Sequence, residues 1–324
     1  MPKAIRVHQT GGPEVLRYEE FDPGPPGEGE VLLRHTAIGL NFIDVYDRTG
    51  LYPMPIPGGL GREAAGIVVA VGKKVRGWRV GERVAYVHSK PGAYAELRNV
   101  PAARLVKLPK GISDEQAAAA MLKGLTAHYL LRRTYRVQRG DWILVHAAAG
   151  GVGLILCQWA RALGAKVIGV VGSEAKAALA KKHGCHHVLV TPRDPVLANV
   201  RRLTKDVGVS VVYDSVGKDT FMESLDCLRP LGMMVTYGNA SGPPPAVSPL
   251  ELAKRGSLFL TRPSLFAYIS KREDLDAAAR ELFAALKSRK FRLLIGQRYP
   301  LADAAQAHRD LEARRTTGSS VLIP

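Results

Sequence analysis

One stretch of this chain, residues 141–153, constrains its fold more than any other. An apolar run of strand length, from Trp142 to Val145, leads into a turn of small residues that ends at Gly153. The turn opens into an apolar helical pattern, which Gly164 closes. Strand, glycine turn and helix, in this order, are the context that makes a dinucleotide-binding fingerprint credible. Small residues let the backbone approach a pyrophosphate, and the N–H groups of the helix N-terminus attract its charge.

The fingerprint departs from Gly-x-Gly-x-x-Gly at its first position. Ala148 stands where the first glycine is usual, and Gly150 and Gly153 follow at the spacing of the second and third. A strand–helix turn that packs tightly without a ligand is the alternative interpretation. The flanking strand and helix patterns favour a pyrophosphate site.

Around this turn, from about Gly124 to Pro263, apolar strands alternate with helical patterns. Strands are predicted at 142–145, 166–171, 188–190, 209–213, 233–237 and 257–260. After the helix that follows the glycine turn, further helices are predicted at 174–183 and 220–228. Repeated βα units predict an α/β fold with a doubly wound parallel sheet.

The segments on either side lack this alternation. Residues 1 to about 110 carry short runs broken by Gly and Pro clusters, which suggests a barrel-like sheet, and Ser113 is expected to cap a helix. Later elements are predicted at 273–287 (helix), 301–314 (helix) and 319–323 (strand). We therefore expect one domain of residues 1–123 and 264–324, with a dinucleotide-binding domain of residues 124–263 inserted into it and the cleft between them.

Composition narrows the class of protein. The 324 residues are 46% hydrophobic and 23% charged, which suits two globular domains. No apolar stretch has the length of a membrane span and no secretory signal is evident, so the cytoplasm is expected. Cys157, Cys185 and Cys227 lie far apart in apolar runs, which predicts small core residues and not a disulfide framework or a cysteine-rich zinc site.

The net charge of +17 admits an anionic ligand, a nucleic-acid partner or a basic solvated surface. Basic residues are spread along the chain, and no single run dominates. This distribution favours a solvated surface, with a nucleic-acid face as the alternative.

The end of the second predicted strand indicates the cofactor. An NAD site usually carries Asp or Glu there, about 20 residues past the glycines. Here Gly172 and Ser173 occupy the strand end and Lys176 follows within one helical turn, so there is room and charge for a 2′-phosphate, and NADPH is predicted. Glu174 is the opposing feature. Pointed at the ribose it would favour NAD, and otherwise it is an ordinary acidic residue at a helix N-terminus.

Several motifs along the whole chain carry a family resemblance. They are GGPEVL at 11–16, GLNFID at 39–44, GLYP at 50–53, LKGLTA at 122–127, HAAAGGVG at 146–153, YDSVG at 213–217, YGN at 237–239 and TRPS at 261–264. Through them the chain resembles the zinc-independent quinone oxidoreductases of the medium-chain dehydrogenase/reductase superfamily. The resemblance implies a Rossmann-type sheet inserted into a mainly β, GroES-like barrel domain, NADPH as cofactor, hydride transfer to a quinone, and a homodimer.

The resemblance also implies that zinc is not used. Zinc-dependent relatives have a Cys near position 41 and a His in a Gly-His-Glu motif, where this chain has Asn41 and Arg62. A protonated arginine cannot ligate zinc. The cysteine-rich lobe that holds a second, structural zinc is also missing. The hard chemical step then belongs to the cofactor.

Site residues follow from the same resemblance. Those expected to border the nicotinamide and the substrate are Asn41, Phe42, Asp44, Tyr46 and Tyr52. Those expected along the rest of the cofactor are Thr126, Tyr129, Gly150, Gly151, Val152, Gly172, Ser173, Lys176, Ser215, Tyr237, Gly238, Asn239, Pro263, Ser264, Leu265 and Arg314. Where bacterial relatives have a tyrosine near the 2′-phosphate, this chain has Thr191, then Pro192 and Arg193. Either Arg193 compensates, or the preference for NADPH is weaker.

The sequence is compatible with more than one proton donor and more than one class of acceptor. A quinone takes up a hydride and then a proton, so a positioned acid would help. Tyr52 is a candidate because related enoyl-thioester reductases use a tyrosine in a similar motif; the alternatives are a pocket-shaping aromatic with water as donor. Scattered histidines without an evident acidic partner are expected to be structural or on the surface: His8, His35, His88 and His308. Competing functions are reduction of 2-alkenals or enoyl thioesters and, in another class, zeta-crystallin-like RNA binding.

Overall fold

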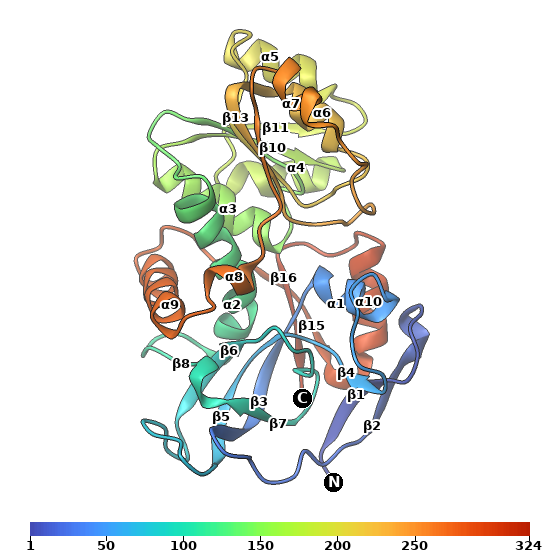
Figure 1. Ribbon diagram of the computed structural model, residues 1–324, viewed down its shortest axis with the longest axis vertical. Helices are drawn as coiled ribbons and strands as arrows, with labels where there is room; N and C mark the ends of the chain where they lie inside the picture. Colours follow the sequence, from blue (N-terminus) through green and yellow to red (C-terminus); the bar gives the residue numbers. More distant parts are fainter. The chain divides into compact units, whose positions relative to one another are not determined.

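The structure is a computed structural model that describes all residues from Met1 to Pro324. The chain forms two compact units (Figure 1). The first comprises Met1–Leu125, Ile269–Lys287 and Leu293–Pro324, and the second comprises Thr126–Tyr268 and Ser288–Arg292. No helix is both long enough and apolar enough to cross a bilayer.

The second unit is built on a six-stranded sheet in the order β11-β10-β9-β12-β13-β14, and every neighbouring pair is parallel. The strands are β9 (Trp142–Val145), β10 (Lys166–Val171), β11 (His187–Val190), β12 (Val209–Asp214), β13 (Leu228–Thr236) and β14 (Phe259–Thr261). In chain order this is 3-2-1-4-5-6, the arrangement of dinucleotide-binding sheets. The predicted doubly wound parallel sheet is confirmed.

Five helices, α3 to α7, connect these strands, η3 precedes the first strand and α8 follows the last. They are the π-helical turn η3 (Leu130–Thr134), α3 (Gly151–Ala162), α4 (Glu174–Lys182), α5 (Val196–Thr204), α6 (Phe221–Asp226), α7 (Pro249–Lys254) and α8 (Leu265–Tyr268). The six residues of β12 are all buried, because both faces of a central parallel strand are covered. Cys157, Cys185 and Cys227 are buried as free thiols, which confirms their prediction as core residues.

The first unit is mainly antiparallel. A seven-stranded sheet has the order β15-β16-β3-β5-β6-β8, with β7 also paired to β3, and a three-stranded sheet has the order β2-β1-β4. The strands are β1 (Lys3–Val7), β2 (Leu16–Glu20), β3 (Glu30–Leu40), β4 (Gly58–Gly59), β5 (Glu63–Val71), β6 (Arg83–Val87), β7 (Leu97–Pro101), β8 (Leu105–Lys107), β15 (Ile295–Pro300) and β16 (Ser319–Ile323). Because β16 pairs antiparallel with β3, the last strand of the chain extends the sheet formed by the N-terminal segment.

The helical elements of this unit are η1 (Pro13–Val15), α1 (Phe42–Thr49), η2 (Ala102–Arg104), α9 (Arg272–Lys287), η4 (Leu301–Asp303) and α10 (Ala304–Glu312). Helix α2 (Asp114–Tyr129) begins as expected, since Ser113 Oγ accepts from the Gln116 N–H at 3.1 Å and Gln116 returns the contact at 3.0 Å. The last helix is shorter than the predicted 301–314. It starts with a 3₁₀ turn and ends at Glu312, and Arg314 has a left-handed φ of 57° that a helix cannot continue through.

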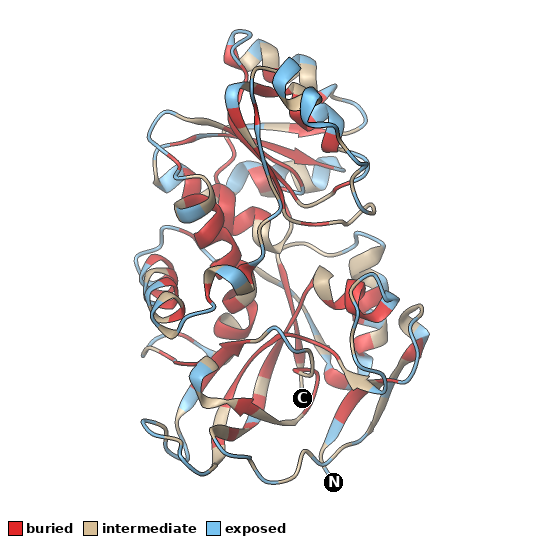
Figure 2. Ribbon diagram, in the orientation of Figure 1, coloured by how far each residue is buried: buried red, intermediate tan, exposed pale blue.

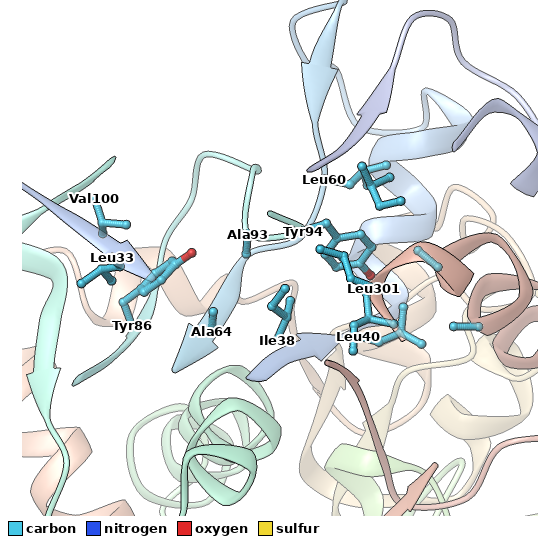
Figure 3. Close-up of a cluster of buried hydrophobic side chains, with 14 of the residues drawn as sticks. Leu33, Ile38, Leu40, Leu60, Ala64, Tyr86, Ala93, Tyr94, Val100 and Leu301 are labelled. Atoms are coloured by element: carbon cyan, nitrogen blue, oxygen red, sulfur yellow. The ribbon is translucent and has the colours of Figure 1, made fainter. Parts of the chain in front are cut away.

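Burial follows the predicted patterns (Figure 2). On α9, the predicted apolar face is buried, namely Leu275, Ala279, Leu282, Phe283 and Leu286. Figure 3 shows part of the core of the first unit, where Leu33, Ile38 and Ala64 lie on neighbouring strands and Tyr94 packs near Leu60 and Leu301. This core supports the N-terminus of α1, where the predicted substrate residues begin.

Candidate active site

In the second unit, the predicted cofactor residues other than Thr126 and Tyr129, which lie in the last turn of α2, lie at the carboxyl ends of the parallel strands or at the helix N-termini that follow. Gly150 to Val152 follow β9, Gly172 to Lys176 follow β10, Ser215 follows β12, Tyr237 to Asn239 follow β13, and Pro263 to Leu265 follow β14. Parallel strands in one sheet point the same way, so their carboxyl ends share one edge. Five sequence-separated segments therefore meet at the edge where such sheets bind ligands.

The turn between β9 and α3 explains the glycine spacing. A Cβ on Gly153 would overlap the carbonyl oxygen of Ala147 and would lie 2.8 Å from the Cα and carbonyl carbon of Ala148. Ala147 itself adopts a left-handed φ of 51°, and its carbonyl accepts from the Gly150 N–H at 2.9 Å. The Ala148 N–H is tied to Val170 O on β10 at 3.1 Å. The turn is thus a tight backbone cradle in which a side chain at position 153 does not fit, as a pyrophosphate site requires.

The end of β10 is open and polar. A Cβ on Gly172 would meet nothing within 4 Å. Ser173 caps α4, since its Oγ accepts from the Lys176 N–H at 3.4 Å, and Lys176 lies in the first turn of that helix. This strand end has room for a phosphate, together with the positive end of a helix and a lysine.

The segments after β12 and β13 are held together by Asp214. Its Oδ1 accepts from the two backbone amides that follow Ser215, at 2.7 and 3.2 Å, and its backbone carbonyl accepts from the Tyr237 N–H at 2.7 Å. A Cβ on Gly238 would overlap the Ser215 carbonyl oxygen, so these two backbones touch. Arg262 belongs to the TRPS motif but was not predicted as a site residue; it donates to Gly238 O at 3.0 Å and so ties the end of β14 to the same edge.

Tyr129 is buried in the second unit, with 3% of its surface exposed. Its ring stacks on Tyr268 with centroids 4.5 Å apart and planes 11° apart, and burial raises the pKa of its hydroxyl. Thr134 donates to the Tyr268 hydroxyl at 2.8 Å, which fixes the stack to the π-helical turn. Sequence reasoning missed Tyr268, because the pair is separated by well over a hundred residues and no motif marks it. Thr126 is also buried.

In the first unit, the predicted substrate residues gather around the N-terminus of α1. Asn41 precedes the helix, and Phe42 and Tyr46 lie on it one turn apart with ring centroids at 5.9 Å. Tyr52, from the loop that follows, packs edge-on against Tyr46 at 5.3 Å, and its N–H donates to Tyr46 O at 3.1 Å. The structure therefore brings four of the predicted residues into one aromatic and amide cluster.

Asn41 is oriented by an ion pair that sequence reasoning missed. Its Nδ2 donates to Glu63 Oε1 at 2.8 Å, and the same oxygen accepts from Lys123 Nζ at 3.3 Å. The other carboxylate oxygen of Glu63 accepts from the Leu122 N–H at 2.5 Å. All three side chains are buried, with Glu63 fully enclosed. A Cβ on Gly39 would overlap this carboxylate, which explains why the residue before Leu40 is glycine.

Asp44 faces away from solvent into a buried network. Its Oδ2 accepts from the Asn41 N–H and from the Tyr94 hydroxyl, both at 2.8 Å, while its Oδ1 has no hydrogen-bond partner. The Tyr94 hydroxyl also lies 3.2 Å from Nε2 of His308, whose Nδ1 is 3.0 Å from Arg48. Burial, reinforced by the charge of Asp47, raises the pKa of Asp44 to about 7. Asp44 was predicted to border the substrate. In the structure its side chain is fully buried (0% exposed) and accepts the Asn41 N–H at the start of α1.

The histidines have mainly structural partners. Burial, with the charge of Arg48, lowers the pKa of His308 to about 3, and burial lowers that of His35 to about 4, so both are neutral at pH 7. His35 contacts Ala95 O at 2.7 Å and the Tyr86 hydroxyl at 3.1 Å. His8 does have an acidic partner that the sequence did not reveal, Glu19, at 3.0 Å on the surface.

A doubly wound nucleotide-binding unit with an antiparallel β unit is an architecture of dinucleotide-dependent oxidoreductases, and the comparisons agree. A family model described as "Alcohol dehydrogenase GroES-like domain" matches residues 27–110, and one described as "Zinc-binding dehydrogenase" matches residues 151–284. A quinone oxidoreductase of Pseudomonas aeruginosa is 53% identical over 325 residues, covering 100% of both chains. A 2-haloacrylate reductase of a Burkholderia species is 46% identical over 100% of this chain and 99% of its own.

A solved structure of Escherichia coli quinone oxidoreductase complexed with NADPH matches with a TM-score of 0.97 at 50% identity, covering 99% of this chain and 100% of that one. The chain belongs to the quinone oxidoreductase family of the medium-chain dehydrogenase/reductase superfamily. The predicted Rossmann-type sheet with a GroES-like domain is thereby confirmed.

The second family model is described as a zinc-binding dehydrogenase, but this chain does not carry zinc ligands at the positions where zinc-dependent relatives have them. The Arg62 guanidinium donates to both carboxylate oxygens of Asp47, at 2.9 and 2.6 Å. The Asn41 amide nitrogen donates to Glu63. Two donors stand where zinc-dependent relatives supply a thiolate and an imidazole, so these residues do not form a zinc site.

Proposed function

We propose that this protein reduces quinones with NADPH by hydride transfer, without zinc. The observation that carries the proposal is the backbone cradle at Gly153, joined to an open, lysine-bearing strand end, in a chain half identical to a quinone oxidoreductase solved with NADPH. The proposal assigns catalysis to a domain of residues 1–123 and 264–324 and dinucleotide binding to residues 124–263.

Each part of the cofactor has proposed contacts. The pyrophosphate is held by Gly150, Gly151 and Val152 at the N-terminus of α3, and the 2′-phosphate by Ser173 and Lys176 beside Gly172, with Arg314 as an additional contact. The remaining cofactor residues are Thr126, Tyr129, Ser215, Tyr237, Gly238, Asn239, Pro263, Ser264 and Leu265. NADPH, when bound, supplies the hydride.

The residues around α1 receive the acceptor in this proposal. Asn41 and Phe42 flank the nicotinamide, and Tyr46 and Tyr52 give the aromatic walls that a flat quinone requires. Asp44 acts through Asn41, whose backbone N–H it accepts at 2.8 Å. Tyr52 is the proposed proton donor to the reduced acceptor, with water as the alternative. Tyr52→Phe keeps the aromatic wall, so a retained KM with a lowered kcat would identify the phenol as donor.

The test of the proposal is oxidation of NADPH, followed at 340 nm, with 1,4-benzoquinone and 1,2-naphthoquinone as acceptors. We expect turnover with both quinones and faster turnover with NADPH than with NADH. Tight NADPH binding without turnover on any quinone would contradict the activity while leaving the cofactor assignment intact.

A second acceptor class has a specific observation in its favour. The Burkholderia relative, at 46% identity, is named for reduction of a 2-haloacrylate, an alkene conjugated to a carboxylate. Hydride addition to a conjugated alkene also needs a proton donor. Turnover of 2-alkenals or crotonyl thioesters above that of quinones, lost in Tyr52→Phe, would favour this alternative.

We also propose that the protein works as a homodimer. Strand β14 is an edge strand, and Phe259 and Leu260 on it are 56% and 37% exposed. Leu231 and Leu250 add exposed fractions of 60% and 66% in the same unit. An apolar edge strand left uncovered promotes aggregation, and pairing with the same strand of a second copy would cover it. Light scattering should give a dimer mass, and Leu260→Lys should give a monomer.

Cytoplasmic function and the absence of a main role in nucleic-acid binding complete the proposal. Several surface arginines are engaged in ion pairs, including Arg83 with Asp114, Arg298 with Glu115 and Arg315 with Asp310. Weak RNA binding that ignores sequence would be bulk electrostatics. Tight, sequence-selective binding with a steep salt dependence would favour the RNA-binding alternative.

A further inference from the structure

The end of β10 carries two opposing signals for the cofactor. Lys176 favours a 2′-phosphate, but Glu174 stands at the first position of α4, where acidic residues of NAD sites accept hydrogen bonds from the ribose hydroxyls. A carboxylate there also repels a phosphate. Its side chain is 68% exposed, so burial does not restrain it.

The structure shows what restrains Glu174. Arg193, in the loop after β11, donates from Nη1 to Glu174 Oε1. Its Nε and Nη2 donate to the two carboxylate oxygens of Asp194 at 2.9 and 2.7 Å. One guanidinium therefore joins the acid at the end of β10 to an acid at the end of the neighbouring strand.

Arg193 is anchored to the sheet and not simply laid on the surface. Asp194 Oδ2 accepts from the Val190 N–H at 2.8 Å, and the Asp194 N–H donates to Val190 O at 2.8 Å. Strands β10 and β11 are in register here, with Val171 opposite Val190. The hydrogen bond from Arg193 is the main cause that lowers the pKa of Asp194 to about 2, so Asp194 stays ionised.

We propose that Arg193 is a specificity-determining residue: it engages the Glu174 carboxylate and so keeps that acid from selecting an unphosphorylated ribose. This inference rests on the proposed use of NADPH and deepens it. The loop after β11 thus acts on the acid that competes with the phosphate, through Arg193 and its anchor Asp194.

The test compares four variants: Arg193→Ala, Glu174→Gln, the double variant, and Arg202→Ala as a matched control. Arg202 is an exposed arginine of the same surface groove of about 610 Å³, but its guanidinium contacts Asn199 at 3.0 Å and not Glu174. Calorimetry with 2′,5′-ADP and 5′-AMP measures how strongly each variant prefers a ligand that carries the 2′-phosphate. The ratio of kcat/KM with NADPH to kcat/KM with NADH measures the same preference during turnover.

We expect Arg193→Ala to lower the 2′,5′-ADP preference roughly fivefold to tenfold, since an uncovered like charge then faces the phosphate. The double variant should return to within about twofold of Glu174→Gln, and Arg202→Ala should match the unmodified protein. A double variant as weak as Arg193→Ala would overturn the inference, because Arg193 would then contact the phosphate itself. An unchanged preference in Arg193→Ala would overturn it as well. Failure of the unmodified protein to bind 2′,5′-ADP would count against the proposed cofactor instead.

Discussion

Replacing Lys123 by methionine should destabilise the first unit by about 3–5 kcal/mol, because it leaves the Glu63 carboxylate buried without its cation. Lys123 Nζ lies 3.3 Å from Glu63 Oε1, with 7% and 0% of the two side chains exposed. At that separation and an effective dielectric constant of about 20, the Coulomb attraction is about 5 kcal/mol. Methionine keeps the length of the side chain, so the loss reports polar interactions and not packing: the ion pair with Glu63 and the hydrogen bond from Nζ to Leu40 O at 2.9 Å.

Two companion variants isolate the cause. Glu63→Gln combined with Lys123→Met removes both charges, and a glutamine can still accept the Leu122 N–H, so the share of the loss that comes from the unpaired carboxylate should return, while the share from the hydrogen bond to Leu40 O should remain. Lys107→Met is the exposed control. Its ion pair with Glu82 has a similar distance, 2.9 Å, but Lys107 is 71% exposed, and its loss should cost about 0–1 kcal/mol.

The measurement is urea unfolding at pH 7, with hydrogen exchange of the β5 amides as a reporter of the first unit. The KM for 1,4-benzoquinone should also rise in Lys123→Met, because Glu63 holds the Asn41 amide. A loss below about 1 kcal/mol in Lys123→Met, or a double variant no more stable than the single one, would refute this reasoning.

Three further predictions concern other parts of the proposed site. Gly153→Ala should cost about 1–3 kcal/mol in thermal unfolding and weaken NADPH binding, because its Cβ would overlap the Ala147 carbonyl. Gly172→Ala has open space around its Cβ and should leave stability unchanged. Equal effects of the two substitutions would contradict the steric argument for the turn at Gly153. Lys176→Ala should weaken NADPH, but not NADH, by about 1.5–3 kcal/mol in fluorescence titrations, and equal losses for the two cofactors would show that the lysine does not recognise the phosphate. With a native pKa of about 7, Asp44 keeps a proton that the unfolded chain releases near pH 4, so the free energy of unfolding should fall by about 4 kcal/mol as the pH rises through this window. Asp44→Asn should lack that fall in urea unfolding at pH 4.5 and 8, and parallel pH profiles for the two proteins would count against the raised pKa.

Local patterns predicted the elements that depend on local chemistry. The glycine turn, the alternation of strands and helices and the buried face of α9 all follow from periodicity and from residues that tolerate close packing. Helix α5 was not predicted: Pro195 at its start offers no side-chain cap, and its apolar face is short, with Val196, Val200 and Thr204 buried. Helix α10 ends before the predicted residue 314 because Arg314 takes a left-handed backbone conformation. The residue type arginine does not indicate such a conformation in a sequence.

The support of the candidate site could not be predicted in the same way. Glu63 and Lys123 are 60 residues apart, and Tyr94 and His308 are 214 apart. No periodicity links such residues, since the sheet pairing of the first unit brings them together. The residue types gave no warning either, because isolated Glu and Lys residues are usually solvated.

Several of these unpredicted contacts share one feature, the pairing of a carboxylate with a cation. Three carboxylates near the proposed site are each held by a cation from another segment: Glu63 by Lys123, Asp47 by Arg62, and Glu174 by Arg193. Each would otherwise be a candidate base, a metal ligand or a ribose acceptor. Engaged in these pairs, the acids orient neighbouring groups and leave the transfer of hydride to the cofactor. The strongly basic composition of the chain therefore has a role within the fold as well as on its surface. Loss of the buried cation Lys123 should be seen first in stability, whereas loss of the exposed cation Arg193 should be seen first in what its acid binds.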